Sequence, residues 1–230
     1  MDPIIEGIIQ AVNLILTGDP EVVSITALSL FVSIFGTLIA CVWSIPVAVA
    51  LALRSFHGKR ILKGLFNAMI GVPTVALGLY LYLLLSRAGP LGYFQLLYTP
   101  YAIMIGQSVL VTPIIVSFAT GALESVDPDL RTLARTLGAS DLQTYSVVLG
   151  EAFWGVVLAI MAAFNRAFAE LGVAMMLGGN IRYLTRVLTT AISLETARGE
   201  IALSIALSFI LLGVVMSLSV AINLARKSSQ

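Results

Sequence analysis

Long apolar runs alternate with short polar segments along most of this chain. Ser24–Leu53 holds thirty residues without a charged side chain, and Pro100–Ala122 and Ile201–Ala225 are also uncharged. Gly64–Ser86 and Ala152–Leu177 are two further runs of similar length. Because a helix needs about 20 consecutive apolar residues to cross a bilayer, the pattern predicts an all-α integral membrane protein with five spans.

Two of these runs carry features that a plain spanning helix lacks. Gly71-Val72-Pro73 interrupts the second run, and Arg166 and Glu170 lie about one helical turn apart inside the fourth. Ionisable side chains inside a membrane are costly, and they usually face a partner or a water-filled path. Their spacing also allows the two to pair with each other. Pro73, Arg166 and Glu170 are therefore candidates for a pathway or gate, and the alternative is a structural ion pair that locks helices together.

A shorter amphipathic helix is expected at the beginning of the chain. One face of residues 4–17 carries the apolar side chains Ile5, Ile8, Ile9, Val12 and Leu16. This stretch is too short to span a bilayer, so we expect residues 1–20 to form a helix in the membrane interface, or else one packed against the bundle. The start, MDPIIEG, lacks a basic segment, so no signal peptide is expected. Residues 21–230 are expected to form the transmembrane domain.

The segment Glu124–Glu151 is the longest stretch with regularly spaced charge. Asp127-Pro128 predicts a helix start, and Gly138 predicts the end of that helix. Ser140 with Gln143 has the spacing of a capping box, which predicts a second helix. One face of the first helix is apolar and consists of Leu130, Leu133, Ala134 and Leu137. The segment therefore predicts a helix, a glycine turn and a helix between two membrane spans.

The composition supports a membrane protein that is surrounded by lipid. Of the 230 residues, 59% are hydrophobic and 11% are charged, whereas soluble domains carry about 25% charged residues. The mean hydropathy is +1.01. The net charge of +1 gives no basic surface for nucleic acid. A single cysteine, Cys41, cannot form a disulfide within the chain, and with a single histidine, His57, a metal site is not expected.

An ATP site is not expected in this chain either. The sequence lacks the Gly-x4-Gly-Lys-Ser/Thr pattern of P-loop proteins, since Gly58-Lys59-Arg60 has the wrong context. If the chain pumps a substrate, it therefore needs a separate ATPase as its partner, and it carries no cofactor of its own.

Lysine and arginine residues near the span ends predict the orientation of the chain. One side of the membrane carries eight of them, namely Arg54, Lys59, Arg60, Lys63, Arg131, Arg135, Arg226 and Lys227. The other side carries four, namely Arg87, Arg182, Arg186 and Arg198. The side with eight is expected to be cytoplasmic. This orientation puts Glu124–Glu151 and the C-terminus inside and the N-terminus outside.

The segment Glu124–Glu151 resembles the coupling loop of ABC-importer permeases, whose motif is Glu-Ala-Ala-x3-Gly-x9-Ile-x-Leu-Pro. Thr132-Leu133-Ala134 stands at the Glu-Ala-Ala positions, Gly138 at the glycine and Val148 at the isoleucine, whereas Gly150-Glu151 replaces Leu-Pro. We term Glu124–Glu151 the coupling segment. The resemblance implies that a separate ATPase contacts Leu130, Leu133, Ala134, Leu137, Gly138, Ala139 and Ser140. An ordinary loop helix is the alternative.

A second resemblance extends over most of the chain, from Ile4 to about Leu212. Gly71–Gly92, and Leu177–Ile181 followed by Thr185–Leu188, are similar to segments of molybdate and tungstate permeases, most of all the tungstate type. This resemblance implies a five-span permease of the inner (plasma) membrane that forms a homodimer with two ATPase subunits. It also implies an extracytoplasmic receptor and a tetrahedral oxyanion as substrate, with tungstate first, molybdate second, and sulfate or phosphate behind them.

The stretch after the fourth span holds further candidates for the pathway. Gly178 and Gly179 give the backbone freedom, and Asn180 with nearby N–H groups could donate hydrogen bonds to an anion. A plain turn at the end of a helix is the alternative. Three arginines follow, which either attract an anion or its receptor or else anchor headgroups and the fold: Arg182, Arg186 and Arg198.

Two other classes of membrane protein fit the apolar pattern. A stand-alone secondary transporter is expected to show internal repeats with charged sites inside the membrane. This chain shows no clear repeat and one charged pair. A structural scaffold would bind no ATPase, so co-purification with an ATPase subunit separates these classes from an importer permease.

Overall fold

The structure is a computed structural model that describes residues 3–228, and this part consists of helices and the loops between them. The α-helices are α1 (Pro3–Leu16), α2 (Pro20–Leu53), α3 (Lys59–Met69), α4 (Thr74–Leu85), α5 (Pro100–Glu124), α6 (Pro128–Thr136), α7 (Asp141–Glu151), α8 (Phe153–Phe168), α9 (Gly172–Gly178), α10 (Leu188–Arg198) and α11 (Ile201–Ser228). A short 3₁₀ helix, η1 (Gly92–Phe94), lies between α4 and α5. The all-α prediction is confirmed for the described residues. Residues 1–2 and 229–230, which belong to the expected domains 1–20 and 21–230, lie outside them.

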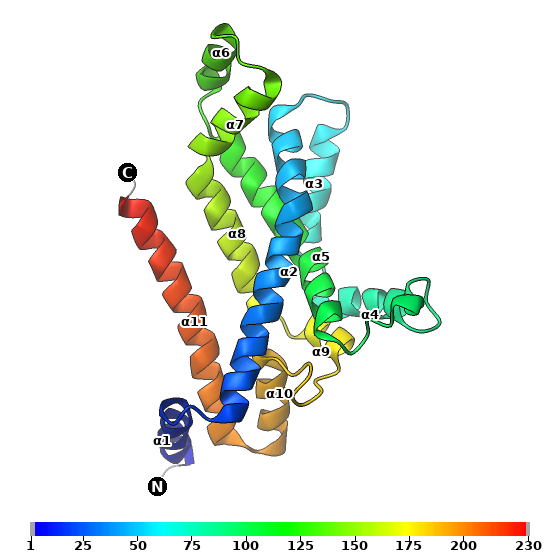
Figure 1. Ribbon diagram of the computed structural model, residues 1–230, viewed down its shortest axis with the longest axis vertical. Coiled ribbons are helices and arrows are strands. Elements are labelled where there is room, and N and C mark those ends of the chain that lie inside the picture. Colours follow the sequence, from blue (N-terminus) through cyan, green and yellow to red (C-terminus); the bar gives the residue numbers. More distant parts are fainter. Residues whose placement is uncertain (1–2, 229–230) are drawn as a thin grey trace.

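Three of the five expected spans are single long helices. α2, α5 and α11 are each long and apolar enough to cross a membrane. α2 and α5 continue through Pro46 and Pro113, which membrane helices tolerate when neighbouring groups satisfy the freed backbone. These three helices and α8 run along the long axis of the molecule (Figure 1). When each sharply bent helix pair is counted as one span, the described residues contain up to five.

The second expected span, Gly64–Ser86, is interrupted, as Gly71-Val72-Pro73 predicted. It is divided into α3 and α4, whose axes differ by 101°. The break covers residues 70–73, and Pro73 has extended backbone (φ −60°, ψ 123°) directly before α4. Proline has no N–H to donate, and it disfavours helical backbone at the residue before it, so a helix tends to end here. As a result, α4 runs across the long axis in Figure 1.

The fourth expected span, Ala152–Leu177, is wrong as a continuous helix. α8 ends at Phe168 and α9 begins at Gly172, so that residues 169–171 form a break. At its other end, α8 meets α7 at a bend of 70°. The stretch 178–199, which follows the fourth apolar run, contains the helix α10. Hydropathy reports the length of an apolar run but not whether the helix within it is continuous.

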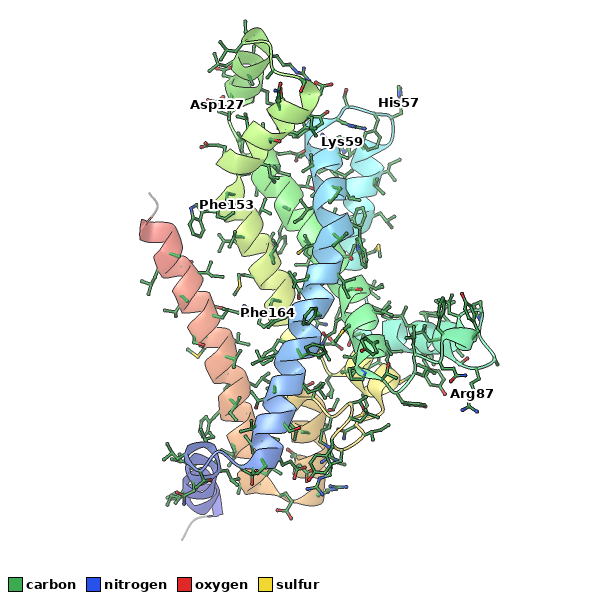
Figure 2. The ribbon with its side chains drawn as sticks, viewed as in Figure 1. His57, Lys59, Arg87, Asp127, Phe153 and Phe164 are labelled. Carbon is green, nitrogen blue, oxygen red and sulfur yellow. The ribbon has the colours of Figure 1, made fainter. Side chains whose placement is uncertain are left out.

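The two ends of the molecule carry different elements. α1 packs against α11 and is seen nearly end-on at the same end as α10 (Figure 1). The side chains of its expected apolar face, Ile5, Ile8, Ile9, Val12 and Leu16, are exposed. α6 and α7 lie at the opposite end, where Figure 2 places Asp127 and Lys59. The N-terminal helix is therefore present and touches the bundle, and its location in a membrane interface stays a prediction.

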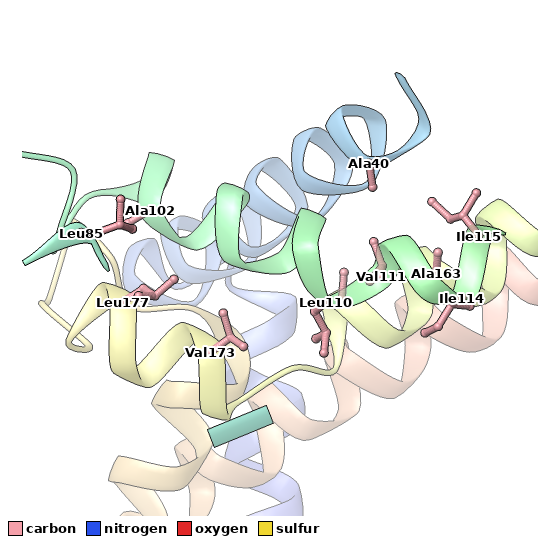
Figure 3. Packing of buried hydrophobic residues seen from close by; sticks show 11 residues of the cluster. Ala40, Leu85, Ala102, Leu110, Val111, Ile114, Ile115, Ala163, Val173 and Leu177 are labelled. Atoms are coloured by element: carbon pink, nitrogen blue, oxygen red, sulfur yellow. The ribbon is translucent and has the colours of Figure 1, made fainter. Parts of the chain in front are cut away.

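Small side chains let the central helices approach one another closely. Ala40 of α2, Ala102 of α5 and Ala163 of α8 are fully buried in the core cluster that Figure 3 shows. At Gly106 of α5, a Cβ would lie only 2.4 Å from Cγ1 of Val173 in α9. Membrane helices associate through such close contacts because lipid gives them little hydrophobic driving force. This packing fixes α9 against α5.

Candidate functional site

The coupling segment forms the helix, turn and helix that its sequence predicts. Asp127 caps α6 and accepts a hydrogen bond from the N–H of Asp129 (2.9 Å). Gly138 has φ +86°, a left-handed conformation that glycine adopts without strain. The expected capping box is present, because the N–H of Ser140 donates to Oε1 of Gln143 (2.8 Å) and the N–H of Gln143 donates to Oγ of Ser140 (3.4 Å). Local hydrogen bonds therefore define both helices.

The apolar face expected on α6 is divided in the structure. Leu130 packs against a buried cluster beneath α6 and α7. Leu133 and Leu137 instead are 56% and 79% exposed. Leu142, near the start of α7, is 76% exposed as well. The helical period of α6 does not extend across the glycine turn, so it could not predict a place for Leu142 on this surface.

Hydrogen bonds and an ion pair hold α6 in position beside these leucines. Arg131 donates to the carbonyl oxygen of Leu123 near the end of α5 (3.3 Å). Arg135 pairs with Asp141 across the turn (3.1 Å), although both side chains are largely exposed and the pair adds at most about 1 kcal/mol. Ala134 and Ala139 are half-buried. The coupling segment thus presents its exposed leucines on an ordered scaffold.

The breaks at residues 70–73 and 169–171 lie next to each other, and we term them the helix junction. A Cβ on Gly172 would lie 2.7 Å from Oγ1 of Thr74 and 3.0 Å from the backbone nitrogen of Val75. Only glycine therefore allows the start of α9 to approach the start of α4. An open groove of about 450 Å³ lies beside this contact, between α4, α9 and residues 169–171. Glu170 lines this groove, and so does Thr74, which directly follows Pro73.

Glu170 is the charged residue at the helix junction, and its side chain is 2% exposed. One carboxylate oxygen accepts from the guanidinium of Arg166, as their spacing predicts. The other accepts from the N–H of Val173 in the first turn of α9 (3.1 Å), where negative charge is favourable. The hydroxyl of Thr189 donates to the carbonyl oxygen of Glu170 (2.7 Å). Glu170 therefore connects α8, α9 and α10.

Gln107 extends this network, although the analysis of the sequence did not select it. Its amide nitrogen donates to the carbonyl oxygen of Ala167 (3.0 Å) and to Oγ of Ser33 (3.4 Å). Gln107 is 2% exposed, and a Cβ at Gly36 would lie 3.1 Å from its Cβ. The sequence does carry a signal for this position, because an amide in an otherwise uncharged span needs a partner inside the protein.

The turn after α9 is closely packed. Gly179 has φ +70°, and its N–H donates back into α9. A side chain at Gly178 would collide with its neighbours. The N–H of Ile181 donates to the hydroxyl of Thr185 (3.0 Å), whereas the side-chain oxygen of Asn180 is buried without a hydrogen-bond partner. The N–H groups of Gly179 and Ile181 thus form hydrogen bonds within the protein. A role for Gly178, Gly179 and Asn180 in a transport pathway stays a prediction.

Two glutamates neutralise most of the arginine charge that was expected to face an anion. Glu21, at the start of α2, pairs with Arg182 and Arg186, and Glu195 pairs with Arg186 and Arg198. The side chain of Arg186 is only 7% exposed between the two carboxylates, which favours the alternative that this arginine anchors the fold. Hydrogen bonding to Glu21 also raises the pKa of Arg182 above its ordinary value. The cluster joins α2, α10 and the loop between α9 and α10.

Comparison with known proteins identifies the family to which this helical arrangement belongs. Residues 44–229 match the family described as binding-protein-dependent transport system inner membrane component. The chain belongs to this family of ABC-importer permeases. The match includes the coupling segment and the helix junction, and it makes the permease a multi-pass membrane protein.

Individual relatives show which kinds of permease this chain is similar to. A probable anion ABC transporter permease from Haloferax volcanii is 40% identical over 202 residues, which are 86% of this permease and 87% of that protein. The tungstate uptake system permease protein TupB from Peptoclostridium acidaminophilum is 36% identical over 212 residues, or 92% and 93% of the two chains. The inward-facing MetNI methionine ABC transporter shares the fold, with a TM-score of 0.67, 17% identity and coverage of 100% and 99%. The predicted resemblance to tungstate-type permeases is confirmed.

Proposed function

We propose that the permease is the membrane subunit of an ATP-driven importer for a tetrahedral oxyanion. Tungstate is the first candidate, molybdate the second, and sulfate or phosphate rank behind them. The observation that carries this proposal is the 36% identity to a tungstate uptake permease across nearly the whole chain. The relative at 40% identity is named only for an anion, which agrees with an oxyanion as substrate.

The exposed leucines of the coupling segment form the proposed docking surface for a separate ATPase. Leu133, Leu137 and Leu142 are each more than half exposed. An apolar helix face that lies in a groove of a partner protein is a common mode of recognition. The capped turn holds α6 and α7 together, so that movement of the ATPase is passed to α8 through the bend of 70°. ATP is bound and hydrolysed by the partner, and the permease itself needs no cofactor.

The helix junction is the proposed gate. Broken helices inside a membrane place backbone groups beside a substrate path, and they provide points where helices can move. Arg166 is 38% exposed, whereas its partner Glu170 is buried and also held by α9. Arg166 can therefore attract an anion while Glu170 keeps its place. Movement of α4 against α9 opens and closes the path, and the turn at Gly178, Gly179 and Asn180 moves with α9.

The proposed complex contains two copies of the permease, two ATPases and an extracytoplasmic receptor. α4 and the loop after it stand out from the body in Figure 1, where a second copy can cover them. Tyr80 on α4 and Tyr93 in the loop are 67% and 74% exposed. The eight-to-four distribution of basic residues supports a cytoplasmic location for the coupling segment. The receptor then delivers its anion at the end that carries α1 and α10.

Uptake by reconstituted vesicles tests the proposed function. Vesicles that contain the permease and its ATPase, with the receptor outside and ATP inside, should accumulate tungstate, which is measured by mass spectrometry. Leu137→Ser should reduce uptake strongly, because it removes an exposed leucine of the docking surface. Leu65→Ser is the control, because Leu65 is an exposed leucine of α3 outside both the coupling segment and the surface proposed for the second copy. Uptake that needs an ion gradient but neither ATP nor the ATPase would contradict the proposal.

A further inference from the structure

Two polar helix faces meet between α3 and α5, at the end of the molecule that carries the coupling segment. Ser117, Thr120 and Glu124 lie at positions i, i+3 and i+7 of α5, and therefore on one face. Lys63 and Asn67 lie four residues apart on α3. All five side chains line a single cavity of about 190 Å³. This cavity is separate from the helix junction and from the exposed leucines of the coupling segment.

Two hydroxyl groups in the cavity have no partner among residues 3–228. Oγ of Ser117 and Oγ1 of Thr120 are buried and make no hydrogen bond within that part of the chain, and Thr120 is 2% exposed. Hydroxyls on helices often donate to a carbonyl one turn earlier, as Thr112 of α5 does to Ser108 (2.8 Å). A buried hydroxyl without a partner is costly. These two donors therefore point to a ligand with acceptor atoms inside the cavity.

The mouth of the cavity carries an excess of positive charge. Glu124 pairs with both Lys63 and Lys59, so that two ammonium groups share one carboxylate. Lys59 also donates to the carbonyl oxygen of Ala52 (3.1 Å). Lys63 has Glu124 as its only ion-pair partner among the described residues. Ammonium, amide and hydroxyl donors around one small space suit an anion with several acceptor oxygens.

We infer that this cavity is an anion site for a tetrahedral oxyanion at the coupling-segment end of the permease. Lys63, Asn67, Ser117 and Thr120 donate to its oxygens, and Glu124 competes with the anion for Lys63. The inference rests on the proposed function, because it assigns residues to the class of anion that the importer carries. Glu124 ends α5 three residues before the cap of α6. An anion that displaces Glu124 from Lys63 therefore acts on the start of the coupling segment.

Direct binding tests the site without the receptor or the ATPase. The full-length permease in phosphatidylcholine nanodiscs is dialysed against tungstate, and bound tungsten is measured by mass spectrometry. We expect saturable binding that Thr120→Val weakens about tenfold, which corresponds to the loss of one hydrogen bond to a charged group. Thr37→Val is the matched control, because Thr37 is also buried and unpartnered but lies outside this cavity. Absence of binding, or equal weakening in both variants, would overturn the inference.

Variants of the ion pair separate an anion site from a purely structural contact. If Glu124 competes with the anion, Glu124→Gln tightens tungstate binding several-fold, whereas Lys63→Gln weakens it. A structural contact alone predicts that both variants lower thermal stability and that neither tightens binding. That result would also overturn the inference.

One further measurement distinguishes a free oxyanion from a lipid phosphate as the ligand. A second distinguishes failure of this site from failure of the proposed import function. A lipid phosphate has similar oxygens, so phosphatidic acid is added to the discs, and we expect it not to displace tungstate. Displacement that depends on Lys63 would overturn the assignment to a free oxyanion. Tungstate uptake without Lys63-dependent binding refutes this site alone, whereas Lys63-dependent binding without ATP-driven uptake refutes only the proposed function.

Discussion

Glu170 shows how a single charged side chain can hold several broken helices together. Its spacing from Arg166 predicted their ion pair, because residues four apart meet on a helix. The contacts with Val173 and Thr189 were beyond prediction, since they arise only because α8 ends before Glu170. The four-residue spacing therefore predicted the ion pair, whereas the other partners of Glu170 depend on the break in the helix.

The Arg166–Glu170 pair leads to a prediction about stability. Glu170→Gln and Arg166→Gln should each destabilise the permease by about 2–3 kcal/mol, because each leaves the other charge unpaired near the membrane interior. The double variant should lose at least about 1 kcal/mol less than the sum of the two. Thermal unfolding of the purified permease measures this, with the exposed Glu200→Gln as a control. Strictly additive losses would show that the two residues do not stabilise each other.

The ion-pair partners of Arg186 could not be predicted from local sequence patterns. Its partners Glu21 and Glu195 lie 165 and 9 residues away in the sequence. A count of arginines near a span end could not reveal that one of them is buried between carboxylates. We expect Arg186→Met to destabilise the permease by roughly 3 kcal/mol, because both glutamates lose a buried partner. Arg182→Met should cost much less, since Arg182 is 55% exposed. Equal losses in thermal unfolding would contradict this account of the cluster.

At the scale of whole elements, hydropathy located the membrane spans but not their shape. The apolar runs at α2, α5 and α11 became single helices, whereas the second and fourth runs are broken. In the sequence, Pro73 indicated the break at residues 70–73. No comparable signal marked the break at residues 169–171, which depends on the contact between Gly172 and Thr74. Close contacts between distant segments cannot be obtained from periodicity alone.

The turn of the coupling segment provides the prediction at this scale. Gly138→Val should leave the permease inserted but weaken its hold on the ATPase, because a side chain at φ +86° costs about 1 kcal/mol or more and shifts α6 against α7. Gly213→Ala is the control, since that glycine has open space and no positive φ. Retention of the ATPase on tagged permease measures the effect. Full retention with Gly138→Val would argue against a coupling role for this turn.

At the scale of the whole molecule, the distribution of charge predicts the orientation in the membrane. α1 and the coupling segment lie at opposite ends (Figure 1), and the basic residues favour the coupling-segment end as cytoplasmic. Single cysteines at Thr17 and Ser125, in a Cys41→Ala background, should therefore react with an impermeant thiol reagent from opposite sides. Labelling of Thr17 from the cytoplasmic side would reverse the proposed orientation. Labelling of both positions from one side would contradict the arrangement itself.

The central claim is that the permease couples ATP hydrolysis to the import of an oxyanion, and receptor-dependent ATP hydrolysis tests it most directly. The permease is reconstituted with its ATPase, and hydrolysis is measured with receptor loaded with tungstate, molybdate, sulfate or phosphate. We predict that the tungstate-loaded receptor stimulates hydrolysis most, and the molybdate-loaded receptor next. Stimulation only by a receptor loaded with an amino acid or a metal cation would contradict the claim.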